Sequence, residues 1–572
     1  MDKYLYYKKV KNEHIFEYLE KSELSLHNLQ NYIPIYNKFF NLNEDNYNNI
    51  NLNQKYSINK IQSIINRNTI SGFLSNTENN QEIEKQIFIK FSPLLDPLKY
   101  LTGKYDTNNE KIFALPGLNN NDDIIPKLYD INNSAYVDGF FTYLSSLLLN
   151  KFNFTNGLDY YGSYLGNKEN FYYNIVDDIE YLNESSFFHE NKNSLFKIEN
   201  EYYNDLFNID SRSKKHKLNI SEKSLKIDTD ELSIINNEEM DTNKMNDFNI
   251  VNLEDLKLDN TVFNCTITKK SSRSCSESSY SSKSSNTNGS QNNEDTNNSI
   301  TSIDTSEIDS SCCSEEEDEE DIFIMINNFP TQLICIEKCE NTLDDLMVNN
   351  KLNNDEWISA LMQVIMMLIT YQNTFSFTHN DLHTNNIMYN KTEKKYLYYT
   401  YNKIHYRVPT YGKIFKIIDY GRAIYKFNGL TMCSDSFHPK GDAATQYNCE
   451  PYFDENKPRL DPNFSFDLCR LGCCLFDYFV EDLNEINSLT KKKPLIALIN
   501  NWVKDDKNRN VLYKTNGDER YPEFKLYKMI ARTVHNHLPE KQLENQLFSK
   551  YKITNIPKKQ KIINLDKIPK MI

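Results

Sequence analysis

Short apolar runs rich in β-branched residues predict several strands along the chain. Runs of this kind, bounded by turn residues, are typical of half-buried strands. The predicted strands cover residues 61–65, 69–74, 86–91, 322–326 and 332–336. They fall into two groups that are far apart in the sequence.

Two segments carry apolar residues at helical spacing. The first begins near Ser134, a residue type that caps helices, and runs to about Asn150. The second runs from about Asp355 to Gln372, and its apolar residues extend around most of the helix circumference. A helix of the second kind is expected in a protein core. Strands and helices together predict an α+β fold.

Between the two groups of strands the composition changes. From Cys265 to Ser314 the chain is mainly Ser, Thr and Asn, and an unbroken acidic run follows from Glu315 to Asp321. Such a segment cannot bury enough apolar surface to offset its ordering entropy. We therefore interpret residues 167–321 as a low-complexity, mostly disordered insert within a domain.

Net charge, hydropathy and cysteine content exclude several classes of protein. The 572 residues carry a net charge of −15, which argues against a protein held on nucleic acid by a global positive field. No apolar run reaches the ~18 residues that span a bilayer, and the first residues lack the apolar stretch of a secretory signal. The 11 cysteines form no C-x2-C pairs. We expect a soluble intracellular protein without a nucleic acid or membrane partner.

Three polar clusters follow the second helix in a fixed order. His379–Asn386 has the form H-x-D-L-x-x-x-N, Asp419–Gly421 follows a short apolar strand, and Asp467–Gly472 has the form D-x-x-x-L-G. In this order they resemble the catalytic loop, the metal-binding motif and the supporting helix of the protein-kinase superfamily. The resemblance covers roughly 56–166 and 322–530. It is greatest to the divergent Ser/Thr kinases of large DNA viruses, with a haspin-like D-L-H-x-x-N loop.

The resemblance implies a bilobal protein-kinase-like fold of the α+β class. A small β-rich N-lobe, with the long disordered insert inside it, would precede a larger helical C-lobe. The implied parts are an N-terminal extension (1–55), the first part of the N-lobe (56–166), the insert (167–321), the last N-lobe strands and hinge (322–340), and the C-lobe with a C-terminal tail (341–572).

The resemblance also assigns roles in phosphoryl transfer from ATP. Asp381 would accept or orient the proton of the acceptor hydroxyl, and Asn386 and Asp419 would hold Mg²⁺, because hard cations prefer oxygen ligands. His379 would brace the loop, and Asp467 would accept hydrogen bonds from its backbone. The alternative interpretation is an ordinary Asn/Asp-rich loop, which the strand and turn context disfavours.

Upstream, Lys90 ends an Ile-Phe-Ile-Lys run that resembles the V-A-I-K strand, whose lysine binds the α- and β-phosphates. An ordinary strand lysine in water is the alternative. The helix from Ser134 offers Asp138 as its acidic partner, one carbon shorter than the usual Glu. Glu337 and Cys339 occupy the implied hinge, where backbone groups would hold adenine.

Two positions depart from the kinase pattern. Gly72 is the only glycine in the segment expected to cover the phosphates, where kinases carry G-x-G-x-x-G. Asn380 stands where most regulated kinases carry Arg, so no receptor for an activation-loop phosphate is evident and constitutive activity is expected.

The leading hypothesis is therefore a Ser/Thr protein kinase that uses ATP and Mg²⁺ on protein substrates, located in host cytoplasm or virion if the chain is viral. A small-molecule phosphotransferase is the first alternative, because D-L-H-x-x-N also occurs in that class. A pseudokinase scaffold is the second: the missing glycines favour it, while the presence of Lys90, Asp381, Asn386 and Asp419 opposes it.

Overall fold

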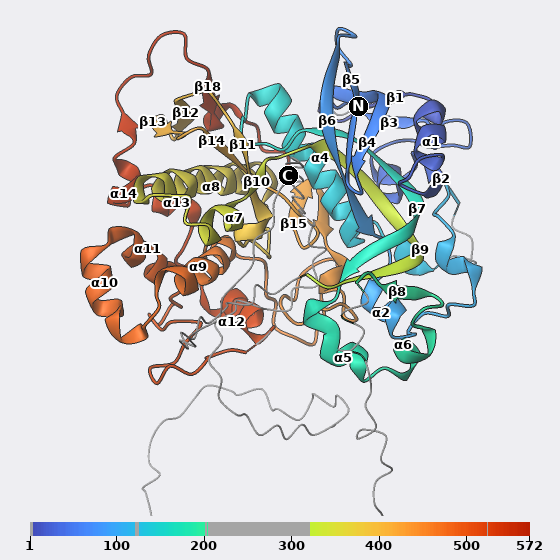
Figure 1. The fold of residues 1–572 in the computed structure, drawn as a ribbon. Helices are drawn as coiled ribbons and strands as arrows, with labels where there is room; N and C mark the ends of the chain where they lie inside the picture. The colour runs from blue at the N-terminus through green and yellow to red at the C-terminus, as the bar shows by residue number, and fades with distance from the viewer. Residues whose placement is uncertain (1–3, 120–124, 201–202, 204–206, 208–320, 523) are drawn as a thin grey trace, which may run out of the picture. The chain divides into compact units, whose positions relative to one another are not determined.

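A seven-stranded antiparallel sheet combines both predicted groups of strands (Figure 1). The structure, a computed structural model, describes residues 4–119, 125–200, 203, 207, 321–522 and 524–572. The sheet has the order β2-β7-β9-β6-β5-β4, and β8 pairs with β9. Its strands are β2 (Leu26–Gln30), β4 (Tyr56–Asn66), β5 (Thr69–Asn76), β6 (Glu82–Pro93), β7 (Tyr160–Asn174), β8 (Phe196–Ile198) and β9 (Phe323–Glu337). The register places Lys90 opposite Ile334.

The two strands predicted at 322–326 and 332–336 are a single long strand, β9. The residues between them continue the antiparallel pairing with β7, for example at Phe329 opposite Lys168 and Pro330 opposite Asn167. The pairing partner therefore overrides the polar interruption that the sequence shows at Asn327 and Asn328.

The first part of the predicted insert, between residues 167 and 198, contains regular secondary structure. Strand β7 continues to Asn174, and the helices α5 (Ile179–Asn183) and α6 (Ser186–Asn191) precede β8. Phe171, Phe188 and Phe196 are buried and anchor this region to the main core. The rest of the predicted disordered insert, residues 208–320 above all, lies outside the described residues.

The predicted N-terminal extension is partly built into the sheet. Strand β2 pairs with β7, and the short strands β1 (Tyr7–Lys9) and β3 (Ile50–Leu52) pair with each other. Helix α1 (Glu13–Glu20) packs Ile15 and Leu19 into the core on one side of the sheet.

The first long helix, α4 (Ser134–Phe152), packs against β7 and β9. Its N-cap is Asn133, one residue before the predicted cap, and the Asn133 side chain accepts a hydrogen bond from the backbone of Ala135 at 3.1 Å. Two short helices, α2 (Pro97–Leu101) and α3 (Pro126–Tyr129), lie in the connection between β6 and α4.

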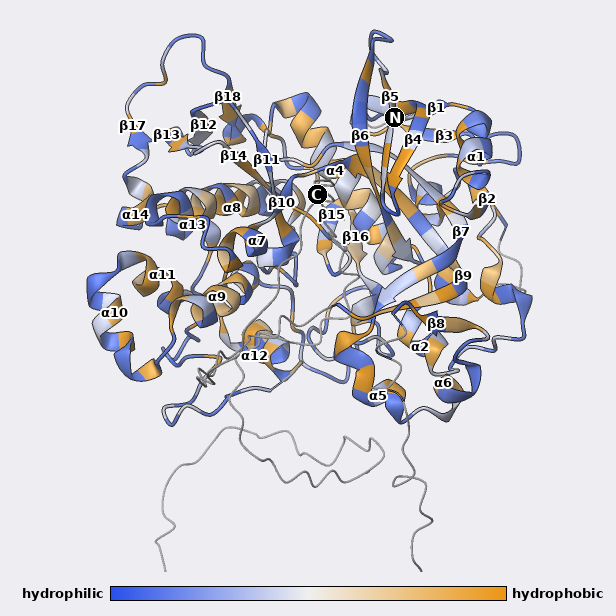
Figure 2. Cartoon of the chain, in the orientation of Figure 1, coloured by the Kyte–Doolittle hydropathy of each residue, from blue (hydrophilic) through white to orange (hydrophobic). Residues whose placement is uncertain are grey.

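The second long helix, α8 (Asn354–Phe375), is the predicted core helix, and Figure 2 shows hydrophobic residues along much of it. Asn353 and Glu356 form a capping box at its start. Among the described residues it is the one helix long and apolar enough to cross a membrane, but 94% of its most apolar window is buried inside the protein. Such burial is typical of a helix in a protein core.

The remaining elements complete a mixed α+β fold, as predicted. The helices after β9 other than α8 are α7 (Leu343–Val348), α9 (Phe466–Phe479), α10 (Ile486–Lys492), α11 (Pro494–Trp502), α12 (Lys525–Thr533), α13 (Pro539–Gln542) and α14 (Gln546–Ser549). Three small sheets accompany them: β10 (Asn341–Thr342), β11 (Ile387–Lys391) and β14 (Lys413–Ile417); β12 (Tyr396–Tyr401), β13 (Ile404–Pro409), β17 (Lys552–Ile553) and β18 (Ile562–Asn564); and β15 (Ile424–Phe427) with β16 (Leu430–Cys433).

Candidate active site

The pairing of β11 with β14 brings two of the predicted motifs together. Ile387 lies opposite Ile417, and the backbone N–H of Ile418 donates to the carbonyl of Asn386 at 3.0 Å. Asn386, just before β11, and Asp419, just after β14, therefore lie at the same end of this small sheet. Asp419 has a φ of 61°, a left-handed conformation that Asp adopts more readily than most side chains.

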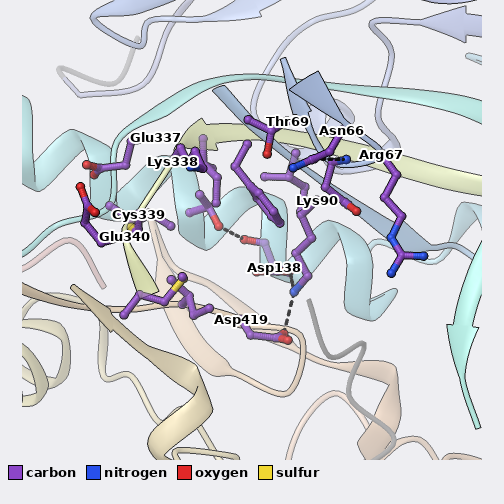
Figure 3. A pocket seen from close by; sticks show the side chains of 18 residues that line it. Asn66, Arg67, Thr69, Lys90, Asp138, Glu337, Lys338, Cys339, Glu340 and Asp419 are labelled. Carbon is purple, nitrogen blue, oxygen red and sulfur yellow. Dashed lines mark hydrogen bonds and ion pairs between the residues drawn. The ribbon is translucent and has the colours of Figure 1, made fainter. Parts of the chain in front are cut away.

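Lys90 joins the large sheet to this end of β14 (Figure 3). Its Nζ lies 2.7 Å from Asp138 Oδ2 and 2.8 Å from Asp419 Oδ1. The other Asp138 oxygen accepts the backbone N–H of Tyr420 at 2.9 Å. Burial disfavours the Lys90 ammonium, but the two carboxylates outweigh burial and raise the pKa of Lys90 above its ordinary value. The predicted Lys90–Asp138 pair is present, and it is coupled to the Asp419 turn.

Gly139, the residue after Asp138, lies where α4 is close to the sheet. A Cβ on Gly139 would fall inside van der Waals contact of the Gln332 amide nitrogen and 3.2 Å from Gln332 Cδ on β9. The missing side chain lets α4 approach the sheet closely. The shorter reach of Asp138 is offset by this close approach.

Helix α9 supports the loop before β11. Asp467 accepts the backbone N–H groups of His379 and Asn380, each at 2.9 Å. The His379 Nε2 lies 2.9 Å from the carbonyl of Ile418, and the Asp381 N–H lies 3.3 Å from His379 Nδ1. These contacts fit a neutral imidazole that donates from Nε2, so His379 braces the loop against the residue before Asp419. Asp467 and His379 thus both contact the backbone around this loop.

Asp381 is buried, and only one of its two carboxylate oxygens has a hydrogen-bond partner. Its Oδ1 accepts the hydroxyl of Tyr527 at 2.8 Å, while its Oδ2 has no hydrogen-bond partner. Burial by itself raises the pKa of Asp381, but the charge interactions with His383, Arg422 and Arg470 and the Tyr527 hydrogen bond outweigh burial, and the pKa falls to about 2. Burial lowers the pKa of the neighbouring His383 to about 4, so that imidazole is neutral at pH 7. Asp381 is therefore ionised at neutral pH and has one oxygen available.

Asn386 and Asp419 have the donor set that Mg²⁺ prefers. The Asn386 amide nitrogen donates to the Asp381 carbonyl at 2.9 Å and lies 3.0 Å from His383 Nε2. The amide oxygen is left as the group that can bind a cation. No cluster of three or more His, Cys, Asp or Glu side chains suited to a metal occurs among the described residues. Mg²⁺ commonly uses one or two protein oxygens together with substrate phosphates, and two such oxygens are present here.

Lys90, Asp138 and Asp419 line a pocket. It is formed by residues 66–69 at the turn between β4 and β5, by Lys90 and Asp138, by residues 337–340 and by Asp419 (Figure 3). The predicted hinge residues Glu337 and Cys339 both line it. The N–H of Glu337 donates to the carbonyl of Asp159 at 3.0 Å and is thus not available to a ligand.

Gly72 does not line this pocket. It lies within β5, opposite Ile61 and Lys85, and a Cβ there would be 2.5 Å from the Lys60 carbonyl. The glycine accommodates the irregular register of β4 at this point. The turn itself is Arg67-Asn68, and both residues line the pocket. The Arg67 guanidinium lies 3.3 Å from Glu199 Oε1.

Asn380 connects the loop to the segment after Asp419. Its amide nitrogen donates to the Arg422 carbonyl at 3.0 Å, and its amide oxygen accepts the Tyr447 hydroxyl at 2.7 Å. Arg422 in turn pairs with Asp442. Asn380 thus holds the segment after Asp419 through neutral hydrogen bonds.

Five residues of this site were not predicted from the sequence: Gly139, Arg67, Arg422, Arg470 and Tyr527. The Asp138-Gly139 dipeptide indicates close helix packing. Arg422 directly follows the Asp419–Gly421 motif and Arg470 lies within the Asp467–Gly472 motif, so both were close in sequence to predicted site residues. Arg67 and Tyr527 reach the site through tertiary structure alone. Comparison with known proteins found no matching family model and no matching curated protein. The functional assignment therefore depends on the residues of this chain.

Proposed function

We propose that the chain is an ATP-dependent protein kinase of bilobal protein-kinase-like fold that transfers the γ-phosphate to Ser or Thr hydroxyls. The observation that carries the proposal is the pair of bonds from Lys90 Nζ to Asp138 at 2.7 Å and to Asp419 at 2.8 Å. Three separate sequence regions supply these residues. Their convergence in one pocket is what phosphate binding beside a metal site requires.

The chemistry follows from charge and position. Asp381 Oδ2 takes the proton of the acceptor hydroxyl as the acceptor oxygen bonds to the γ-phosphorus and the bond to the β,γ-bridging oxygen breaks, which releases ADP. Lys90 neutralises the α- and β-phosphates. Mg²⁺, when bound through Asn386 and Asp419, supplies charge neutralisation for the phosphate oxygens.

The segment between Asn386 and Asp419 favours a protein acceptor over a small molecule. Small-molecule phosphotransferases of this fold typically carry an extra helical insert after the catalytic loop. Here the β12–β13 hairpin occupies that place and joins β17 and β18 in a sheet.

Transfer from labelled ATP tests the proposal. Wild type and Asp381→Asn are incubated with Mg²⁺ and either a mixed protein substrate or amino-sugar and choline acceptors, and nucleotide binding is measured by calorimetry. We expect phosphoserine and phosphothreonine with wild type, and a loss of ~10²–10⁴-fold in the variant with ATP binding retained. Label on the small acceptors alone supports the phosphotransferase, and ATP binding without transfer by wild type supports the scaffold.

A further inference from the structure

A chain of two hydrogen bonds ends on Asp381. Arg470 Nε on α9 donates to the Tyr527 hydroxyl at 2.9 Å, and that hydroxyl donates to Asp381 Oδ1 at 2.8 Å. The direction is fixed, because arginine can only donate and an ionised carboxylate can only accept. The Tyr527 proton therefore points to Asp381.

The chain is shielded from water. Relative exposures are 1% for Asp381, 2% for Tyr527 and 6% for Arg470. The Tyr527 ring stacks on Phe524, with centroids 5.5 Å apart, and the Arg470 guanidinium lies 5.2 Å from the Tyr527 centroid. Packing between α9 and α12 thus sets the position of the hydroxyl, and a buried charge-assisted bond is stronger than an exposed one.

The two Asp381 oxygens have different surroundings. Oδ1 is used by Tyr527, whereas Oδ2 is buried without a partner. Asp381 also lines a second cavity together with Asp419, Arg422 and Ser436. The partnerless oxygen is the one that an acceptor hydroxyl could use.

We propose that Tyr527, held by Arg470, is a positioning residue that occupies Asp381 Oδ1 and so presents Oδ2 to the acceptor hydroxyl. The inference rests on the proposed function. It adds a role for Arg470, a variable position of the third motif, and for Tyr527, which lies outside all three motifs. Tyr527 stays bonded to Oδ1 while the acceptor proton moves to Oδ2, so no proton passes through it.

Tyr527→Phe tests the role, since it removes the hydroxyl and keeps the ring. A lost hydrogen bond to a charged group is worth about 1.5–3 kcal/mol, which corresponds to a fall in kcat of roughly 10–100-fold. The KM for ATP should stay unchanged, because Tyr527 does not line the nucleotide pocket. In an Asp381→Asn background the same change should have little further effect, whereas a purely structural defect would reduce activity again.

Tyr513→Phe is the matched control. It removes a 2.8 Å hydrogen bond from a tyrosine to Asp477 on the same helix, α9, away from Asp381. Calorimetry with ATP and thermal unfolding show whether both variants are folded. Equal kcat in Tyr527→Phe and wild type overturns the inference and leaves the kinase proposal standing. A higher kcat also overturns it, because Tyr527 would then obstruct the acceptor, and no transfer by wild type overturns both.

Discussion

Adding one methyl group at Gly139 should uncouple α4 from the sheet at the point where Asp138 meets Lys90. The Cβ of Gly139→Ala would clash with the Gln332 amide, and it would also lie 3.5 Å from Ile334 Cδ1. Gln332 cannot swing away freely, since it is 1% exposed and donates to Ser163 Oγ at 2.7 Å. Either α4 moves outward or this hydrogen bond breaks.

Gly139→Ala should affect the rate of phosphoryl transfer more than the free energy of unfolding. Overpacking costs about 1–3 kcal/mol, while alanine is favoured over glycine within a helix by about 1 kcal/mol. The free energy of unfolding should therefore fall by only about 0–2 kcal/mol. An outward shift of α4 lengthens the 2.7 Å bond between Asp138 and Lys90, so phosphoryl transfer should fall by at least about 10-fold.

Urea unfolding and initial transfer rates, measured on the same preparations, check this prediction. Gln332→Ala added to Gly139→Ala makes room for the methyl and should restore much of the rate, with a coupling of about 1 kcal/mol or more between the two sites. Gly117→Ala is the control, because a Cβ there meets no atom within 4 Å. Unchanged activity in Gly139→Ala, or additive effects in the double variant, would refute the close-approach explanation.

Two further predictions concern the loop. The folded pKa of His383 is about 4 and lies below its unfolded value of about 6.5, so the unfolded state binds more protons as the pH falls through that window. The unfolding free energy should therefore drop by about 2 kcal/mol between about pH 7.5 and about pH 5. Urea titrations of His383→Gln should no longer show this drop. His14→Gln, a substitution at an exposed histidine, is the control and should still show it. Tyr447→Phe removes the 2.7 Å hydrogen bond to Asn380. It should increase amide hydrogen exchange in residues 435–450 and lower the rate of phosphoryl transfer several-fold. The Kd for ATP should not change. Unaltered exchange there would mean that Asn380 does not anchor the segment.

The sequence predicted those parts of the site whose chemistry depends on contiguous residues. Asp381 and Asn386 lie five positions apart on one loop, and Asp419 ends a short strand, so their spacing is visible without a fold. Tyr527 was not predictable in this way, because it lies 146 positions from Asp381 and is brought there by the packing of α12 on α9. Gly72 misled the analysis, because a glycine within an irregular strand and a glycine in a phosphate loop look alike in sequence.

Helix α4 is fixed to the segment after Asp419 at several points besides Asp138. Asp435 accepts the backbone N–H of Ser134 at 3.0 Å, and the Tyr425 hydroxyl donates to the Val137 carbonyl at 3.0 Å. These contacts join the start of α4 to the segment that carries the Asp419 turn, and none of them involves a phosphate. Moving α4 away from Lys90 would break them together and leave the buried Asp435 carboxylate short of donors, a cost of at least about 1–3 kcal/mol for each lost partner. The paired geometry at Lys90 is thus supported by the chain itself, which is the physical basis for expecting activity without phosphorylation.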